Sequence, residues 1–308
     1  MQYHKPVLLK ESIELLSLKQ GSIFVDATLG GGGHTEAILR NTQVKHIYAI
    51  DQDSDALSYA AERLKPYSEK ITYIKANFEE LRTQLALRKV KGIDGILFDL
   101  GVSSHQLDEG ARGFSFEKDA TLDMRMNQQS PITVKELLNT LSVEVMTKIF
   151  RDFGEEQAAY KIAQWIDKER QSKKIETTQD LSNIIEKNMR SNPVLVIKTK
   201  ARIFQALRIY LNRELEVLQV GLDDALNIMN PHGRIVVISY HSLEDRIVKT
   251  TFAKAAKGCI CPMTIPVCMC NQKARIKLIS KKAIKPSDEE QKTNSRSRSA
   301  KLRAVEKY

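Results

Sequence analysis

Residues 26–35 read DATLGGGGHT, a run of four glycines with an aspartate before it and a histidine after it. Glycine loses more backbone freedom on folding than any other residue, so this run indicates that something must approach the bare backbone closely. A phosphate, a dinucleotide or another nucleotide-like cofactor could lie against such a loop. The residues around it distinguish these possibilities.

The end of the loop argues against a phosphate cradle, because a P-loop requires Gly-Lys-Ser/Thr and this chain has Gly33-His34-Thr35. The dinucleotide pattern G-x-G-x-x-G is met only in part. Gly30 and Gly32 fit it, but Thr35 occupies the place of the third glycine. Asp51, 21 residues after Gly30, suits ribose hydroxyls. NAD enzymes and S-adenosylmethionine enzymes share that acid, so it leaves both open.

Acidic residues favour a cationic cofactor. Asp26, Asp51, Asp53 and Asp99 each follow an apolar run that predicts a strand, so we expect them near one crevice. Four carboxylates would repel a pyrophosphate and attract a sulfonium and an ammonium group. S-adenosylmethionine carries both cations and no phosphate, and its methionine part could lie over the glycine loop. The alternative is that these acids are helix caps and turn residues, which we favour for Asp53.

The elements that position these residues follow from the apolar pattern. Four runs, 22–28, 46–51, 71–76 and 93–100, alternate with helical patterns, which predicts a parallel sheet covered on both faces. About a hundred residues of helical spacing follow Leu100. Further strands are predicted in RIVVISY, ARIKLIS and AKLRAVEK, and the alternation in the last is typical of an edge strand. We expect an α/β fold, Rossmann-like, interrupted by an inserted all-helical domain.

The 308-residue chain is 42% hydrophobic and 28% charged, an ordinary globular composition. It contains no apolar run of about 18 residues and no signal-peptide pattern, so we expect a cytoplasmic protein without a membrane span. Of the net charge of +10, residues 271–308 carry +8, from 12 Lys/Arg and 4 Asp/Glu. This basic segment indicates a nucleic-acid partner. A solvated tail is the other interpretation.

The stretch DLGVSSHQLDEGARGFSFEKDATLDMRM, residues 99–126, puts a polar loop directly after a buried strand. In methyltransferases that act on exocyclic base amines, this strand end carries the acceptors that handle the substrate. Such an amine, for example N4 of cytosine, is a weak nucleophile because its lone pair is delocalised into the ring. Acceptors for its hydrogens, together with in-line placement, would assist methyl transfer. Asp99 could be such an acceptor, with Ser103 and Ser104 positioning the substrate. Alternatively, Asp99 contacts the cofactor and never the base.

Eight motifs in order resemble the RsmH (MraW) family of bacterial methyltransferases, which act on N4 of a cytosine in 16S ribosomal RNA. They are GGGGHT, AIDQD, DLGVSSHQLDEGARGFSF, LDMRM, FGEE, FQALRIYLNREL, SYHSLEDRIVK and SRSRSAKLRAVEK. The resemblance runs from about residue 4 to 307. It implies a class I S-adenosylmethionine-dependent fold with an inserted helical domain. It also implies a set of cofactor-binding residues: Gly32, Gly33, His34, Asp51, Phe78, Asp99 and Gln106.

We therefore expect a first methyltransferase segment at 1–108, a helical domain for substrate recognition at 109–204, and a second segment at 205–308. The expected partner is 16S rRNA or the small ribosomal subunit, and the oligomeric state is left open. Two alternatives are a DNA amino-methyltransferase and a non-catalytic nucleic-acid-binding protein with a vestigial cofactor pocket.

SYHSLEDR, residues 239–246, follows a predicted strand and opens a helix. Ser242 with Asp245 resembles a capping arrangement, which leaves His241 unexplained. We hypothesise that Tyr240 and His241 position the target base, and that Asp99 and His241 are candidates for the catalytic group. A Ser-His-Asp hydrolase is disfavoured because no G-x-S-x-G motif is present.

Basic residues could extend the RNA surface. Arg296 and Arg298 precede the last predicted strand and suit RNA phosphates. Others lie in or near the insertion, although most surface lysines are merely solvated: Lys161, Lys168, Lys173, Lys174, Lys198, Lys200 and Arg202.

All four cysteines lie in CICPMTIPVCMC, at positions 259, 261, 268 and 270. Cys259, Cys261, Cys268 and Cys270 could hold a tetrahedral zinc, although a C-x-C gap is tighter than usual. Disulfides are disfavoured in a cytosolic chain. Unliganded thiols are the simpler interpretation, and no metal site is assigned from the sequence.

The glycine run divides into separate expected roles. Gly30 serves the turn, Gly32 and Gly33 allow close approach of the methionine part, and His34 begins the helix. Gly31 has no assigned role, so we predict that it tolerates a larger side chain better than Gly32 does.

Overall fold

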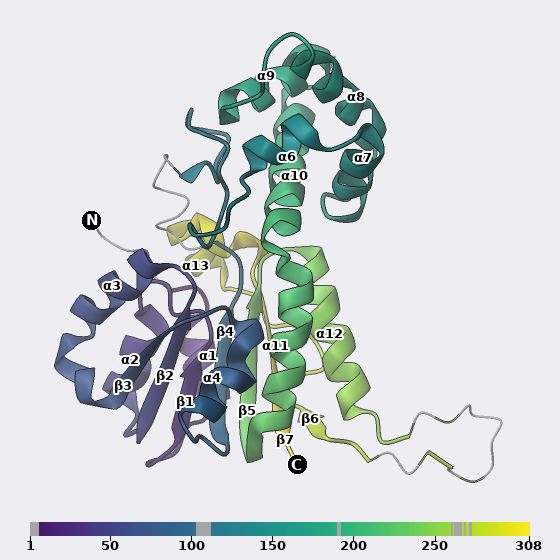
Figure 1. Ribbon diagram of the computed structural model, residues 1–308. Helices are drawn as coiled ribbons and strands as arrows, with labels where there is room; N and C mark the ends of the chain where they lie inside the picture. The colour runs from purple at the N-terminus through teal and green to yellow at the C-terminus, as the bar shows by residue number, and fades with distance from the viewer. Residues whose placement is uncertain are drawn as a thin grey trace. The chain divides into compact units, whose positions relative to one another are not determined.

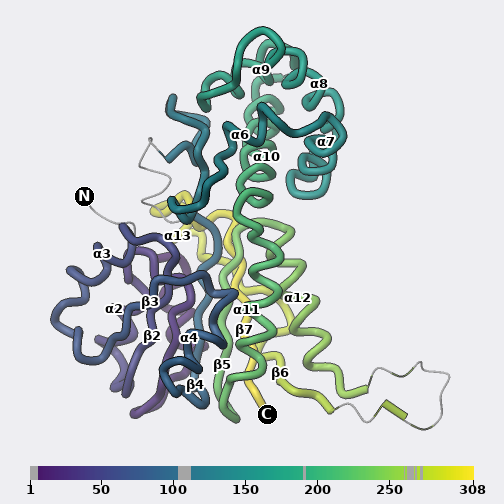
Figure 2. Tube along the Cα trace, in the orientation of Figure 1, coloured from purple at the N-terminus to yellow at the C-terminus, as the bar shows by residue number. Residues whose placement is uncertain are grey.

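The computed structural model describes residues 6–102, 112–189, 192–259, 261, 267, 269–270 and 273–308. The chain forms two compact units (Figures 1 and 2). One comprises residues 1–101 and 215–308, and we call it the sheet unit. The other comprises residues 102–214, and we call it the helical unit.

The sheet unit contains a seven-stranded sheet in the order β3-β2-β1-β4-β5-β7-β6, and its neighbouring strands are parallel except where β7 is one of the pair. The strands are β1 (Ile23–Asp26), β2 (His46–Asp51), β3 (Ile71–Lys75), β4 (Ile93–Asp99), β5 (Met229–Ser239), β6 (Ile276–Leu278) and β7 (Lys301–Lys307). The four strands predicted in the first hundred residues, and their parallel pairing, are confirmed.

Helices cover both faces of this sheet. Its helical elements are α1 (Leu9–Leu16), α2 (Gly33–Asn41), α3 (Ser54–Arg63), η1 (Lys65–Lys70), η2 (Phe78–Glu80), α4 (Leu81–Leu87), α11 (Glu214–Ile228), α12 (Ser242–Ala256), α13 (Asp288–Thr293) and η4 (Ser295–Ser299). Phe24 packs in a core with α1, α2 and α3, while its neighbour Val25 packs in a second core with α4, α11 and α12. Because successive strand residues point to opposite faces, this alternation explains why the strands read as continuous apolar runs. The predicted Rossmann-like α/β fold is confirmed.

One strand prediction is wrong. AKLRAVEK forms β7, but β7 lies between β5 and β6 and is not an edge strand. The short β6 pairs with its outer side, from Ile276 opposite Lys307 to Leu278 opposite Val305. Alternation of apolar and polar residues shows that one face of a strand is more buried than the other. Interior strands can have this property too, so the pattern does not identify an edge strand.

The helical unit has its own apolar core, built by helices α6 (Val134–Thr140), α7 (Val143–Asp152), α8 (Ala159–Arg170), α9 (Thr178–Asn188) and α10 (Pro193–Asn212). Thr133, Ser142 and Thr177 cap three of these helices through their side-chain oxygens. The domain boundaries predicted at 108 and 204 stay a prediction. Within the described ranges, no helix combines the length and apolar character needed to cross a membrane.

Candidate active site

Acidic side chains gather at the carboxyl edge of the sheet, as the sequence predicted. Asp26, Asp51 and Asp99 are the last residues of β1, β2 and β4. Asp53 is the N-cap of α3, where its carboxylate accepts a hydrogen bond from the backbone N–H of Asp55 at 3.1 Å. The cap interpretation favoured for Asp53 therefore matches its contacts, and the other three acids differ in how much surface they leave for a ligand.

Asp26 is almost fully buried and has protein partners for both oxygens. One oxygen accepts from the Thr35 hydroxyl at 2.7 Å and the other accepts from the Thr28 backbone at 3.2 Å. Burial raises the pKa of this carboxyl, although the Thr35 bond opposes that shift. Asp26 therefore ties the start of α2 to β1 and leaves no surface for a cofactor.

Asp51 holds the glycine loop against β2. Its Oδ2 accepts from the Gly30 backbone N–H at 2.8 Å, and its Oδ1 accepts from the Asp53 backbone N–H at 2.9 Å. Burial raises the pKa of Asp51 to about 6 despite these two hydrogen bonds. The side chain remains partly exposed, so it can still accept hydrogen bonds from a ligand.

The glycine run is shaped by backbone conformation and by neighbouring protein atoms. Gly30 and Gly32 have φ of +49° and +74°, which disfavours any other residue there. A Cβ on Gly32 would lie 3.0 Å from a methyl group of Leu64, and one on Gly33 would lie 2.4 Å from the ring of Pro6. Room for Pro6 thus accounts for Gly33 without a ligand. Gly31, whose φ is not positive, accepts a hydrogen bond from Arg63 through its carbonyl.

Asp99 is held from two sides while part of it stays open. Its Oδ1 accepts from the Tyr240 hydroxyl at 2.7 Å, and its backbone N–H donates to the Thr28 hydroxyl at 2.6 Å. A quarter of its side-chain surface is exposed. Burial raises the pKa of Asp99 to about 7, since the Tyr240 bond offsets the desolvation only in part.

His34 faces the other oxygen of Asp99. The Nε2 of His34 lies 3.1 Å from the carbonyl oxygen of Val7. A carbonyl oxygen can only accept a hydrogen bond, so Nε2 must carry the proton. Nδ1 of the neutral ring then presents a lone pair to Asp99 Oδ2 at 3.6 Å. Burial lowers the pKa of His34, which favours this neutral state. A proton on Asp99 would therefore point at His34.

Phe78 follows β3, as the cofactor assignment requires, but it also has core contacts. Its ring meets that of Phe98 edge to face, with centroids 5.5 Å apart. A Cβ on Gly221 of α11 would lie 2.7 Å from the Phe78 ring. The residue is only half-buried, so an open ring face remains compatible with stacking on a nucleobase.

The capping arrangement predicted at Ser242 is corrected by the structure. His241 is the N-cap of α12: its Nδ1 accepts from the Glu244 backbone at 3.4 Å, and its Nε2 lies 3.1 Å from a Glu244 carboxylate oxygen. Glu244 completes the box by accepting from the backbone N–H of His241. The sequence reading missed this because histidine is not among the common N-cap residues. The spacing His241-x-x-Glu244 could have indicated this capping box, because the glutamate occupies the third position of the helix.

The remaining site predictions fall in different places. Arg296 and Arg298 lie in η4, where Arg296 is partly buried and Arg298 is exposed. Ser103, Ser104, Gln106 and Cys268 lie outside the described residues. The sequence reading did not single out Thr28 or Glu244, although both hold site residues in place.

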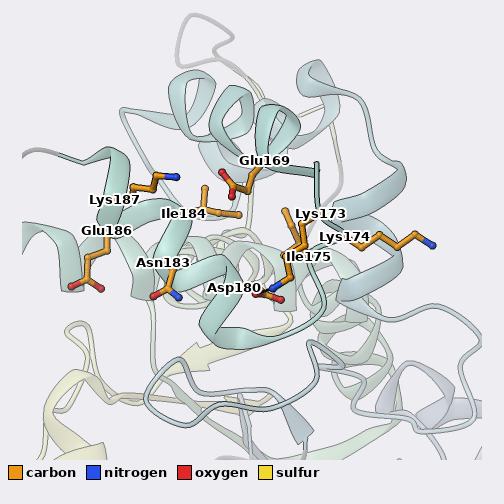
Figure 3. Close-up of a pocket in the computed structure, with 9 residues that line it drawn as sticks. All are labelled: Glu169, Lys173, Lys174, Ile175, Asp180, Asn183, Ile184, Glu186 and Lys187. Carbon is orange, nitrogen blue, oxygen red and sulfur yellow. Dashed lines mark hydrogen bonds and ion pairs between the residues drawn. The ribbon is translucent and has the colours of Figure 1, made fainter. Parts of the chain in front are cut away.

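Several of the basic residues proposed for RNA already have acidic partners in the helical unit. Lys173 pairs with Asp180 at 2.7 Å on the rim of a hollow of about 490 Å³ between α8 and α9 (Figure 3). Lys200 pairs with Glu186 on the same rim at 2.8 Å. Lys174 points away from the Lys173–Asp180 pair in this view. The solvated interpretation therefore fits Lys173, whose side chain is exposed, whereas the Lys200 side chain is mostly buried in its pair with Glu186.

Comparison with known proteins gives the chain a family. The MraW methylase family matches residues 1–308. The chain is 45% identical over 306 residues to the ribosomal RNA small subunit methyltransferase H of Finegoldia magna, covering 99% of this chain and 98% of the relative. Proteins of the same name from Carboxydothermus hydrogenoformans (46%, 99% and 97% covered) and Clostridioides difficile (45%, 99% of each) are equally similar. The chain therefore belongs to the MraW methylase family.

Proposed function

We propose that the protein transfers a methyl group from S-adenosylmethionine to the N4 amine of a cytidine in 16S rRNA of the small ribosomal subunit. Family membership over the whole chain supports the reaction class and the ribosomal substrate. Within the structure, the proposal is carried by Asp99, a partly exposed acceptor at the end of β4 that is oriented by the Tyr240 hydroxyl and has His34 beside it.

The residues at the carboxyl edge fit the cofactor. When bound, S-adenosylmethionine supplies an electrophilic methyl group on a cationic sulfur. Asp51 would accept hydrogen bonds from ribose hydroxyls, and Phe78 would offer a ring face to the adenine. Burial is the main cause of the raised pKa values of Asp51 and Asp99, and neighbouring carboxylates add to the shift of each, so ionised Asp51 and Asp99 are costly without a ligand. A cationic ligand would favour the ionised form of both carboxyls and so offset that cost.

Asp99 would act on the amine of the target base. In its ionised form, Asp99 accepts a hydrogen bond from an N4 hydrogen and so favours the pyramidal, nucleophilic amine. The methylated amine is cationic until it loses a proton. A carboxylate with a pKa near 7 can receive that proton, and the lone pair of His34 Nδ1 would then accept a hydrogen bond from protonated Asp99.

A covalent cysteine intermediate does not fit this geometry. Helix α12 begins at Ser242, directly after the carboxyl end of β5, and runs for 15 residues before Cys259 is reached. At about 1.5 Å per residue, that helix spans about 22 Å. The described thiols therefore lie near the opposite end of α12 from Asp99, and direct transfer to the amine remains the simplest route.

RNA would be held by surfaces outside the cofactor crevice. We assign substrate recognition to the inserted helices, residues 109–204, and phosphate contacts to the basic segment that includes Arg296 and Arg298. The target base would have to leave its stack to reach the methyl group. A ribosomal substrate would be met in the cytoplasm, which is the location we propose for the protein.

Methyl transfer from labelled S-adenosylmethionine tests the proposal. The substrates are small ribosomal subunits lacking the modification, naked 16S rRNA and double-stranded DNA, and digested nucleosides are identified by mass spectrometry. We expect N4-methylcytidine from one or both ribosomal substrates. Label in DNA alone would indicate an amino-methyltransferase of DNA, and no label with any substrate would indicate a binding protein. In the matched control, the Asp99→Ala protein should transfer no label to RNA above the background measured without enzyme.

A further inference from the structure

Three cysteines converge in the segment between α12 and β6. The sulfur atoms of Cys259, Cys261 and Cys270 all lie within 4.8 Å of one another. Each is partly buried, and none of the three forms a disulfide. The chain returns after Cys261, so that Cys270 lies against the Cys259–Cys261 pair. These thiols take no part in the proposed methyl transfer.

The sulfur spacing matches a shared metal ion. Cys259 Sγ and Cys270 Sγ are 3.7 Å apart, far longer than the roughly 2.05 Å of a disulfide. A tetrahedral zinc with Zn–S bonds of about 2.3 Å holds its sulfurs about 3.8 Å apart. The observed separation therefore equals the sulfur–sulfur distance that a zinc–thiolate tetrahedron requires.

The backbone favours thiolate at this position. The N–H of Cys261 donates to Sγ of Cys259 at 3.4 Å, which stabilises negative charge on that sulfur. The segment also carries cations at Lys257, Lys273 and Arg275, which offset the charge of a thiolate cluster. A hard cation would prefer oxygen ligands, so sulfur donors select zinc over magnesium or calcium.

The two ends of the cysteine segment are joined by a backbone hydrogen bond. The backbone N–H of Arg275 donates to the carbonyl of Ala255 at 2.9 Å, joining the end of α12 to the approach to β6. Within the described part of residues 256–274, buried apolar side chains are few, and Val267 and Met269 are 70% and 78% exposed. Such a segment lacks a core of its own, and a metal ion would replace one.

We propose that Cys259, Cys261 and Cys270 bind a structural Zn²⁺ between the end of α12 and the start of β6. Binding releases the thiol protons and fixes Cys270 against Cys259 and Cys261. The remaining coordination position is decided by experiment, because Cys268 lies outside the described residues. In the sequence, Cys268 and Cys270 form a C-x-C motif like that of Cys259 and Cys261.

Metal content of the full-length protein, purified without chelators, tests the site. Plasma mass spectrometry should find about one zinc per chain, and Co²⁺ exchange should give a thiolate-to-cobalt charge-transfer band with tetrahedral d–d absorption. The double variant Cys259→Ser/Cys270→Ser should lose both signals. Met269→Leu is the matched control: Met269 precedes Cys270 in sequence and is exposed, so the change removes a different sulfur and should keep the full zinc content.

Two controls keep the result interpretable. S-adenosylhomocysteine affinity should be unchanged in the double variant, which shows that the sheet unit still folds. Cys268→Ser should weaken the charge-transfer band from four-thiolate to three-thiolate intensity if Cys268 is the fourth ligand, and should leave the spectrum unchanged if water is. Protein that is metal-free and takes up no Co²⁺, or zinc content that is unchanged in the double variant, would overturn the proposal.

Discussion

His34 Nδ1 lies 3.6 Å from Asp99 Oδ2, and the other ring nitrogen of His34 is engaged by the Val7 carbonyl. A neutral histidine facing a carboxyl group in this way favours a proton on the carboxyl. The pair therefore stores one proton near neutral pH and can exchange it when charge appears in the crevice. This arrangement gives the site a pH dependence whose sign can be predicted.

Cofactor affinity should rise with pH. A cation binds the ionised forms of Asp51 and Asp99, whose pKa values in the folded protein are about 6 and about 7. Below these values the carboxyls are protonated and binding must release protons, so affinity is weakest at low pH. Between pH 6 and 8 we expect a gain of about tenfold for S-adenosylmethionine. Calorimetry in two buffers of different ionisation enthalpy measures both affinity and proton release.

The control for that experiment is Asp99→Asn, which removes the group that titrates near pH 7. Its affinity should be lower and should vary less over the same range. A wild-type affinity that is flat from pH 6 to 8, with no proton exchange, would contradict the assignment of Asp51 and Asp99 to the cofactor edge.

Asp99→Asn should also stabilise the cofactor-free protein at alkaline pH while abolishing turnover. The folded pKa of about 7 lies above the ordinary value of 3.8, so the fold prefers protonated Asp99. Its stabilising contribution is complete below pH 4 and is lost as pH rises through 7. Asparagine cannot ionise, can accept from Tyr240 and can donate to His34. We expect the gain to be larger at pH 8 than at pH 5 by on the order of 2 kcal/mol, because part of the penalty is already present at pH 5.

Thermal unfolding at the two pH values measures this difference. A melting temperature that falls equally at pH 5 and pH 8 would show that asparagine disturbs packing and that Asp99 carries no ionisation penalty. Asp53→Asn is the matched comparison, since asparagine is an equally good N-cap and should change stability little.

Tyr240→Phe should shift the activity profile to higher pH. The Tyr240 hydroxyl donates to Asp99 and lowers the pKa of that carboxyl, so its loss raises the pKa further. At pH 7 less of the variant carries the ionised acceptor, and we expect about a tenfold lower kcat. Turnover measured from pH 6 to 9 should recover in part at the alkaline end. A uniform loss with an unshifted profile would assign Tyr240 to packing alone.

Much of the sheet unit could be predicted from the sequence, because its strands are apolar runs and its parallel pairing follows from their alternation with helices. Asp51 and Asp99 could be placed at one edge for the same reason. Individual contacts could not be. That Gly33 makes room for Pro6, and that His241 caps α12 with Glu244, depend on distances that spacing does not encode. β7 lies inside the sheet because β6 pairs with its outer side. β6 has only three residues, too few for a pattern that predicts which strand it pairs with.

The glycine run offers a test of separate roles. Gly32 has a φ of +74°, and an added Cβ would press on Leu64, whereas Gly31 is not in the left-handed region. We therefore expect Gly32→Ala to cost on the order of 1–2 kcal/mol of stability. Gly31→Ala should be nearly neutral. For Arg substitutions, cofactor affinity should fall more at Gly32 than at Gly31. Equal losses of affinity in Gly31→Arg and Gly32→Arg would refute this division.

His241 can be tested by separating its cap from any contact with the base. His241→Ala removes the side-chain acceptor at the start of α12 and should cost about 1 kcal/mol of stability. His241→Asn restores a good cap without the imidazole. Because both ring nitrogens lie against Glu244, we expect the asparagine protein to regain stability and turnover on RNA together. Stability that returns while kcat stays at the alanine level, with cofactor affinity unchanged, would instead assign His241 to positioning the target base.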